Sequence, residues 1–326
     1  MIDPNQRNPA LPLVLLAFAA VYVIWGSTYL AILFAVESLP PFLMAGFRFL
    51  GAGAVLLLFA ALRRKSLAWP TRQELLSTVI IGGLLLLGGN GAVVWAELTT
   101  DSGLVALIVA TVPLWMVVLD WLLFGGGRPG RRVAGGLALG LGGVALLIGK
   151  TSFEEGSAQG CLAVVGGSLS WALGSLLSRR LPLPRSGLMS TALQMAGGGV
   201  LLIVAGSATG EWARLDLASA SSRSWIALAY LLVFGSLVAF SCYTWLLRVS
   251  TPARVGTYAY VNPVVAVTLG WLFAGEELSG RMLFASSIIV IAVFLITGAR
   301  GPGPRIKKDP EPLPPLTASP RPTPSR

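Results

Sequence analysis

The stretch YAYVNPVVAVTLGWLFAGE, residues 258–276, is long and apolar enough to form a membrane-spanning helix, yet it carries Asn262 and Pro263 in its first third. A second stretch, VATVPLWMVVLDWLLFGGG, residues 109–127, has a proline and a tryptophan at the same spacing. The two align without a gap at an offset of 150, which places Pro113 on Pro263. Their likeness predicts an internal repeat.

The alignment of the two halves extends well beyond these stretches. At the offset of 150 the further matched positions are Trp95 with Trp245, Trp121 with Trp271, Leu122 with Leu272, Gly125 with Gly275, Gly130 with Gly280 and Arg131 with Arg281. Nearer the N-terminus the offset is 146, and the matched positions are Trp25 with Trp171, Arg48 with Gln194, Gly51 with Gly197 and Gly53 with Gly199. One difference in loop length accounts for the change, so we expect two related units, residues 12–149 and 150–299.

The composition is that of a membrane protein. Of the 326 residues, 55% are hydrophobic and 12% are charged, and the mean hydropathy is +0.77, whereas soluble domains carry about 25% charged residues. Windows of about 20 residues, the length that crosses the hydrocarbon layer, predict ten transmembrane helices. They cover residues 12–35, 41–62, 75–96, 103–124, 131–149, 160–178, 188–206, 225–247, 254–274 and 281–299. The expected fold is an all-α polytopic membrane protein with five helices in each unit.

Lysines and arginines are distributed unequally between the two sides of the membrane. With residues 1–11 in the cytoplasm, 19 of them lie in cytoplasmic segments and four lie outside, namely Lys150, Arg214, Arg223 and Arg281. The positive-inside rule therefore predicts that both termini are cytoplasmic. The net charge of +10 reflects this topology, so we expect no nucleic-acid partner. The proline-rich segment 300–326 is expected to be a disordered cytoplasmic tail.

The odd number of helices in each unit has a consequence for function. The second copy of a five-helix unit must enter the membrane from the opposite side, which gives an inverted repeat. Inverted repeats are a signature of secondary transporters, which bind a small molecule near the middle of the bilayer and expose it to each side in turn. We therefore expect a multi-pass protein of the bacterial inner membrane, whose partners are the lipid bilayer and a small-molecule substrate.

Several segments also resemble a known family, in the order in which that family carries them. They are VYVIWGSTYLAI in the first span, PPFLMAGFRFLGAG at the second, LLLLGGNGAVVWAE in the third, VATVPL in the fourth, GSLSWALGSLLSRRLPLP in the sixth and TYAYVNPVVAVTLGWLFAGEEL in the ninth. Over residues 12–299 the chain resembles the EamA-type transporters of the drug/metabolite transporter superfamily. It looks closest to bacterial inner-membrane exporters of amino acids, aromatic ones among them, and related metabolites.

The resemblance implies ten spans in two EamA repeats, a central cavity between the repeats and cytoplasmic termini. One departure from the family pattern is visible. Members often carry a glutamate just after both the fourth and the ninth spans, and this chain has Glu276 after the ninth but Gly126 at the equivalent position after the fourth. A shared role for the two positions is therefore in doubt.

Pro113 and Pro263 are the candidate hinges. A proline lacks the backbone N–H that would bind the carbonyl four residues earlier, so each one disrupts its span. Such carbonyls are tolerated at membrane depth only where they are buried in protein or line a wet cavity. A bend that faces the transport pathway is one interpretation, and a static packing kink is the other.

The candidate cavity residues combine aromatic rings with small polar groups. They are Trp25, Thr28 and Tyr29 on one face of the first span, Trp171 and Ser175 in the sixth, and Tyr258 and Asn262 on one face of the ninth. Such faces suit a substrate with an apolar body and polar ends, although each tryptophan taken alone is equally consistent with packing. The amide of Asn262 requires a partner, either in another helix or in the substrate.

Arg48 is a charge placed well inside a span, where an ionisable group is a functional hypothesis by default. Its planar guanidinium could bind a substrate carboxylate through two parallel hydrogen bonds. The alternative is a structural ion pair with Glu97, which lies at the outer end of the third span on the same face as Asn90. Asp120 lies near the inner end of its span, so a direct pair with Arg48 is not expected. Both interpretations of Arg48 stay open.

The sequence carries no catalytic or nucleotide-binding pattern. The segment GGGRPGRR lacks the ending of a phosphate loop, and the chain contains no histidine, so we expect no cofactor, no bound metal and no enzymatic activity. Small residues in the fifth span predict close helix packing within the chain, and we expect a monomer or a weak homodimer; these residues are Ala134, Ala138 and Gly142, with Gly136 and Gly140. The leading hypothesis is export of amino acids or related metabolites by alternating access. The alternative is efflux of drugs or other metabolites.

Overall fold

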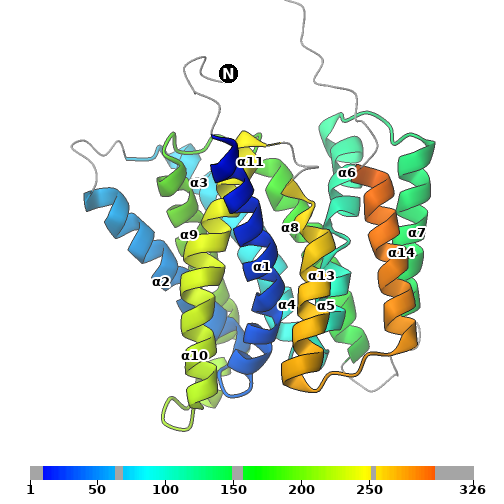
Figure 1. Cartoon of the computed structure of the whole chain (residues 1–326). Helices are drawn as coiled ribbons and strands as arrows, with labels where there is room; N and C mark the ends of the chain where they lie inside the picture. Colours follow the sequence, from blue (N-terminus) through cyan, green and yellow to red (C-terminus); the bar gives the residue numbers. More distant parts are fainter. Residues whose placement is uncertain (1–9, 63–68, 149–156, 251–254, 298–326) are drawn as a thin grey trace, which may run out of the picture.

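The computed structural model of the chain describes residues 10–62, 69–148, 157–250 and 255–297, and all regular structure in these ranges is helical (Figure 1). The first half contains α1 (Leu11–Val36), α2 (Pro41–Leu62), α3 (Arg72–Gly82), η1 (Gly83–Asn90), α4 (Gly91–Ala96), α5 (Ser102–Val109), α6 (Val112–Phe124) and α7 (Arg131–Ile148). The second half contains α8 (Ser157–Leu177), α9 (Gly187–Ala208), η2 (Glu211–Arg214), α10 (Ser222–Tyr230), η3 (Leu231–Phe240), α11 (Ser241–Val249), α13 (Tyr258–Leu269), η4 (Gly270–Ala274) and α14 (Gly280–Thr297).

Within the described residues, seven helical segments are long and apolar enough to cross a membrane. They are Leu11–Val36, Pro41–Leu62, Arg72–Ala96, Ser102–Phe124, Ala158–Leu177, Gly187–Ala208 and Ser222–Val249. Two shorter apolar helices, Val261–Ala274 and Leu283–Ala292, fall where the sequence predicts the ninth and tenth spans, and α7 falls where it predicts the fifth. The all-helical membrane fold is confirmed, while the count of ten spans stays a prediction.

The π-helical segments η1 and η3 occupy equivalent places in the two halves. Each lies in the middle of a long helical segment, between α3 and α4 in the first half and between α10 and α11 in the second. A π-helical turn has one extra residue per hydrogen-bonded ring, and such turns are frequent at functional sites. Both segments contribute residues to the cavity described below.

The two halves meet along α2 and α9, which are equivalent helices of the repeat. A Cβ on Gly53 would lie 2.8 Å from the backbone nitrogen of Ala196, and a Cβ on Gly199 would lie 2.6 Å from that of Leu50. At the offset of 146 these two contacts are images of each other. Residue numbers rise along α2 as they fall along α9, so the helices are antiparallel, as expected for copies that enter the membrane from opposite sides.

The equivalent helices α7 and α14 form a second antiparallel pair (Figure 1). A Cβ on Gly140 would lie 3.4 Å from the Cβ of Ala292, and one on Gly143 would lie 2.8 Å from Cγ1 of Ile289. The predicted packing of the fifth span within the chain is therefore present. Of the five small residues predicted to pack, Gly136 and Gly140 are buried, whereas Ala134, Ala138 and Gly142 are exposed. Small residues occur on both faces of this helix, so their spacing alone did not select the buried one.

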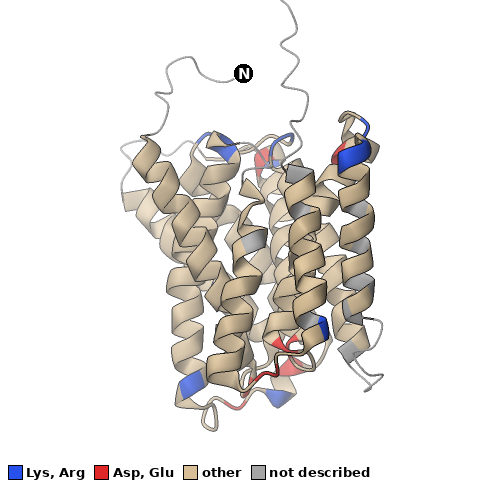
Figure 2. Cartoon of the chain, turned by 45° about the vertical axis from the view of Figure 1, so that its right-hand side comes forward, with Lys and Arg blue, Asp and Glu red and all other residues tan. Residues whose placement is uncertain are grey.

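A glutamate from the second half caps α2 of the first half. Glu211, which is 1% exposed, accepts hydrogen bonds from the backbone N–H groups of Phe42 at 3.2 Å and Leu43 at 2.8 Å. A carboxylate stabilises a helix N-terminus because it binds free N–H groups and opposes the positive end of the helix dipole. Most of the charged residues coloured in Figure 2 lie, like this one, at the two ends of the helices.

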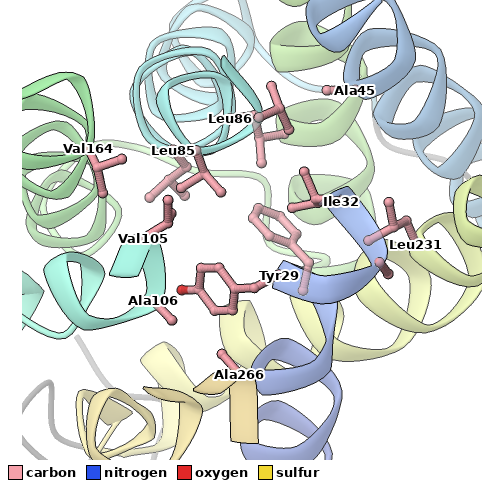
Figure 3. Packing of buried hydrophobic residues seen from close by; sticks show 14 of the residues in the cluster. Tyr29, Ile32, Ala45, Leu85, Leu86, Val105, Ala106, Val164, Leu231 and Ala266 are labelled. Atoms are coloured by element: carbon pink, nitrogen blue, oxygen red, sulfur yellow. The ribbon is translucent and has the colours of Figure 1, made fainter. Parts of the chain in front are cut away.

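A continuous apolar core fills the space between the helices. Figure 3 shows Tyr29 and Ile32 projecting from α1 into the same interior as Leu85 of η1 and Val105 of α5. All four side chains are buried. Because these residues come from three separate helical segments, α1, η1 and α5, their packing fixes the positions of the helices that surround the cavity.

Candidate functional site

A cavity lies among helices of both halves, and the space free of protein atoms at this site, open solvent included, is about 640 Å³. Eight of the ten predicted cavity residues line it: Trp25, Thr28, Tyr29, Arg48, Asn90, Trp171, Tyr258 and Asn262. The other described residues of the lining are Ile32, Phe49, Gly89, Val93, Val109, Val112, Gly167, Ser168, Gly235 and Phe240.

In three cases, equivalent positions of the two halves both line the cavity. The pairs that line it are Trp25 with Trp171, Asn90 with Phe240, and Val112 with Asn262. In each of the last two pairs, one half supplies an amide and the other an apolar side chain. The cavity is therefore built by the repeat, but its polarity is asymmetric.

Three aromatic rings form one wall of the site, which we call the aromatic wall: Trp25, Trp171 and Tyr258. The ring centroid of Trp25 lies 5.5 Å from that of Trp171 and 5.3 Å from that of Tyr258, both edge to face. Such geometry is favourable because the positive edge of one ring meets the negative face of another. The indole N–H of Trp25 donates to the carbonyl of Gly235 at 3.2 Å, which ties α1 to η3.

Tyr243 supports this wall from behind. Its hydroxyl accepts a hydrogen bond from Nε1 of Trp171 at 3.0 Å and lies 2.6 Å from Oγ of Ser175. The Ser175 hydroxyl donates to the carbonyl of Trp171 at 2.7 Å, so Tyr243 is the donor toward Ser175. Ser175 is buried and does not line the cavity, in contrast to the sequence-based expectation. Its four-residue spacing from Trp171 places its hydroxyl on the helix backbone and on Tyr243.

Arg48 projects from α2 to the cavity and is only 3% exposed. Its Nε donates to Oγ of Ser236 at 2.8 Å, and its guanidinium carbon lies 4.5 Å from the ring centroid of Phe49. Gly235 leaves room for the guanidinium, because a Cβ there would lie 2.9 Å from Nη2. Nη1 has no hydrogen-bond partner among the described residues.

The ion pair between Arg48 and Glu97, one of the two interpretations left open by the sequence, is not formed. Glu97 follows α4, is 3% exposed and does not line the cavity. Neither of its carboxyl oxygens has a hydrogen-bond partner in the described part of the chain. Its electrostatic neighbours are Tyr29 and Glu276, so it lies toward the end of the bundle where α5 begins and not beside the guanidinium.

Asn262 has protein partners in two helices. With its amide oriented to suit its surroundings, the nitrogen donates to the carbonyl of Tyr22 at 3.0 Å and to that of Tyr258 at 3.2 Å. The side chain of Tyr29 also hydrogen-bonds to it. The amide thus joins α13 to α1 beside the cavity, which favours the helix-to-helix interpretation of the two that the sequence allowed.

The two prolines have different local structures. In the first half the span is interrupted by a turn at Ala110 and Thr111, and Pro113 begins α6. In the second half Pro263 lies inside the continuous helix α13. Because Val109 and Val112 line the cavity, the break beside Pro113 faces it. Motion at either proline stays a prediction.

A carboxylate lies at the same place in both halves, although it comes from a different position of the repeat in each. Gly125 and Gly275 end their helices with the same positive φ of 69°, and a Cβ on Gly126 would clash with the carboxylate of Asp120. In the second half a Cβ on Gly270 would clash with the carboxylate of Glu276. Asp120 and Gly270 are equivalent, as are Gly126 and Glu276. The carboxylate therefore comes from the helix in the first half and from the loop after the helix in the second half.

Each of these carboxylates connects two separate segments. Asp120 forms an ion pair of 3.0 Å with Arg180, just after α8, and both side chains are partly exposed. Glu276 accepts hydrogen bonds from the backbone N–H groups of Ser102 at 2.8 Å and Gly103 at 3.1 Å, and so caps α5. The departure at Gly126 thus leaves a carboxylate at this place in both halves, and Glu276 links the second half to the first.

Sequence reasoning missed three polar residues of the site. Ser168 lines the cavity from α8, Ser236 holds the guanidinium of Arg48, and Tyr243 supports the aromatic wall. The spacing of Ser168 three residues before Trp171 places both on one helix face, a signal that was available. Ser236 and Tyr243 lie in or next to η3, where the π-helical turn shifts the faces of the helix, so a regular helical period could not have assigned them.

Comparisons with known proteins agree with this architecture. The sequence profile of the EamA-like transporter family matches residues 12–149 and 158–298. The uncharacterized inner membrane transporter YedA of Escherichia coli (strain K12) is 42% identical over 283 residues, which cover 86% of this chain and 89% of YedA. The protein PagO of Salmonella typhimurium (strain LT2) is 28% identical over 286 residues, which cover 87% of this chain and 92% of PagO. A solved crystal structure with 21% identity has a TM-score of 0.61 to this chain, covers 88% of it and 97% of its own length, and shares the fold. This chain belongs to the EamA-like transporter family.

Proposed function

We propose that this EamA-family membrane transporter exports amino acids, aromatic ones included, or related small metabolites across the inner membrane by alternating access. The observation that carries the proposal is the cavity between the two halves, where the aromatic wall occurs together with polar atoms that have no hydrogen-bond partner among the described residues. Such a lining suits a solute with an apolar body and polar ends. The description of YedA as an inner membrane transporter supports both the location and the transport activity.

In this proposal ten spans form two inverted units that move relative to each other around the cavity. The antiparallel contacts of α2 with α9 and of α7 with α14 join the units along close-packed glycines. Ion pairs and caps at the ends of the helices, among them Glu276 on α5 and Arg180 on Asp120, hold one arrangement. Exchange of such end contacts exposes the cavity to one side of the membrane at a time.

Flux measurements in proteoliposomes test the proposal. Vesicles that contain the purified chain are loaded with a panel of neutral, aromatic and charged amino acids, and release is compared with that from protein-free vesicles. We expect protein-dependent, saturable release of at least one neutral or aromatic amino acid. If none is released faster than from protein-free vesicles, amino-acid export is wrong, and a drug or other metabolite becomes the substrate to seek.

A further inference from the structure

Three buried polar atoms at the cavity have no hydrogen-bond partner among the described residues. They are Nη1 of Arg48, the side-chain oxygen of Asn90 and the hydroxyl of Ser168. A buried polar group without a partner costs free energy of about 1–3 kcal/mol, and more where the group is charged. Their occurrence together at one cavity indicates that a ligand completes their hydrogen bonds.

Arg48 is held so that one edge of its guanidinium stays available. Ser236 fixes Nε, the ring of Phe49 lies against the guanidinium, and the backbone of Gly235 packs closely on Nη2. These contacts restrict the side chain without neutralising it. Nη1 is the donor that remains for a ligand.

The cavity offers this charge no counter-ion. Arg48 is the only charged residue among the described residues that line it, and the described ion pairs of the chain all involve other arginines. A buried charge is tolerated where it is paired. An anionic group on the ligand would supply the missing partner, and a carboxylate can accept a charge-assisted hydrogen bond from Nη1.

The other two atoms, the oxygen of Asn90 and the hydroxyl of Ser168, belong to two helices that pack against each other. A Cβ on Gly167, next to Ser168, would lie 3.2 Å from the carbonyl of Gly89, next to Asn90, so α8 and η1 are in contact there. The Asn90 oxygen can only accept a hydrogen bond, and the Ser168 hydroxyl can accept or donate one. This part of the cavity therefore suits a donor group such as an ammonium or a hydroxyl.

We propose that the cavity selects small amphipathic carboxylic acids, with the carboxylate on Nη1 of Arg48 and a hydrogen-bond donor of the ligand on Asn90 and Ser168. The aromatic wall contacts the apolar body of the ligand. The proposal rests on the proposed function in that it concerns the same cavity, and it names which chemical group of the substrate is recognised and by which residue.

Calorimetric titration of the full chain in lipid nanodiscs tests this selectivity without requiring transport. Five amino acids (phenylalanine, tryptophan, leucine, methionine and threonine) are each compared with their own carboxamide, which keeps the body and the ammonium but lacks the carboxylate. We expect at least one acid to bind about tenfold or more tightly than its amide, as follows from the loss of one charge-assisted hydrogen bond. If no acid binds more tightly than its amide, the proposal is overturned.

Variants assign the preference to Arg48. R48M should lose the preference of acid over amide, whereas R48K, which keeps the charge without the planar fork, should reduce it. The matched control is R128M, which removes an exposed arginine outside the cavity and should keep the wild-type preference. A preference that survives in R48M would overturn the role of Arg48. Because the comparison of acid with amide is made first on the wild-type chain, it does not depend on whether R48M folds.

Two further outcomes separate this inference from its neighbours. The phosphonate analogue of phenylalanine is titrated as a third ligand, and if it binds in an Arg48-dependent way while the acids do not, the carboxylate assignment is wrong and the site takes a phosphate-like group. Acids that bind through Arg48 without any flux in proteoliposomes would overturn the proposed function and leave this inference standing. Equal flux of acids and amides would overturn this inference and leave the proposed function standing.

Discussion

Tyr243 closes a cycle of hydrogen bonds that positions the aromatic wall. Its hydroxyl accepts from Trp171 and donates to Ser175, whose own hydroxyl donates back to the carbonyl of Trp171. Y243F leaves the indole N–H of Trp171 without this partner. We expect the free energy of unfolding to fall by about 1–3 kcal/mol, measured as a lower melting temperature of the purified protein. S175A removes a hydroxyl at the other end of the cycle and should cost less; an unchanged melting temperature in Y243F would contradict the cycle.

Asp101, in the loop between α4 and α5, predicts a dependence of stability on pH. Partial burial raises the pKa of this carboxyl, and the charges of Glu276 and Glu277 raise it further. The folded protein therefore keeps the Asp101 proton to a higher pH than the unfolded chain does. The free energy of unfolding accordingly falls as the pH rises from about 3.9, the ordinary pKa of aspartate, through the raised pKa of the folded state. We expect D101N to remove this loss when melting temperatures are compared between pH 3.5 and 7.

Asp216 provides a control of opposite sign. Hydrogen bonds from the Ser219 side chain and from the backbone of Ala218 and Ser219 lower the pKa of its carboxylate. Its contribution to stability is therefore present above the ordinary carboxyl pKa and is lost as the pH falls. D216N should weaken the acid-induced loss of stability, whereas D101N should not. The same change in pH dependence for both variants would contradict the assignment to local electrostatics.

Residue patterns predicted the cavity where aromatic and polar side chains recur at regular helical spacing. Trp25 and Trp171 were found because each has a counterpart in the other half, and both line the cavity. Glu97 and Ser175 were expected at the cavity but lie outside it, because spacing along a helix gives the face of a residue and not the direction in which its polar atoms point. The partners of Arg48 come from η3, and only the three-dimensional packing of that helix identifies them.

At the scale of elements, Glu276 is expected to stabilise α5 across the boundary between the halves. E276A removes the cap on Ser102 and Gly103, and loss of a cap costs about 0.5–2 kcal/mol. The melting temperature of purified E276A should fall, while that of E277A, which removes an exposed neighbouring glutamate, should change much less. Equal effects of the two substitutions would mean that net charge and not the cap is responsible.

The carboxylate of Glu276 lies against Gly270. We therefore expect that replacing Gly270 by alanine has the opposite effect on stability to the usual one. Replacing a glycine within a helix by alanine usually stabilises it by up to about 1 kcal/mol. Here the new Cβ would displace the carboxylate of Glu276, so G270A should destabilise the wild type. In an E276A background the carboxylate is absent, and the same substitution should become neutral or stabilising. Measuring the melting temperatures of the two single variants and the double variant gives this coupling.

The difference between the two proline-containing spans shows where the repeat pattern ceased to predict structure. In the first half the hydroxyl of Thr111 donates to the carbonyl of Ile108 at 2.7 Å, within the turn that separates α5 from α6. The equivalent residue in the second half is Val261, which cannot do so. There the equivalent carbonyl, that of Tyr258, receives the amide of Asn262. The same proline therefore accompanies a broken span in one half and a continuous helix in the other.

At the scale of the whole molecule, the sequence offset between the halves predicted the main contacts of the fold. Gly53 and Gly199 were matched by sequence alone, and both lie at the contact of α2 with α9. The polarity of the cavity departs from this symmetry, since Arg48 lines it while its counterpart Gln194 is buried elsewhere. The sequence repeat predicts the helix contacts because close packing of the backbones requires small residues at the equivalent positions of both halves. Binding a single asymmetric solute imposes no such requirement on the lining.

The orientation in the membrane is the last prediction, and it follows from charge. The beginning of α1 and the end of α14 lie at the same end of the bundle (Figure 1), so the chain between these two points crosses from one end of the bundle to the other an even number of times. The excess of lysine and arginine in the segments assigned to the inside predicts that this end lies in the cytoplasm. Fusions of alkaline phosphatase and of green fluorescent protein after residues 155 and 300 test the assignment in cells. We expect phosphatase activity only at residue 155 and fluorescence only at residue 300. Phosphatase activity at residue 300 alone would reverse the predicted orientation. Phosphatase activity at both residues would overturn the antiparallel crossing of the two halves on which the alternating-access proposal depends.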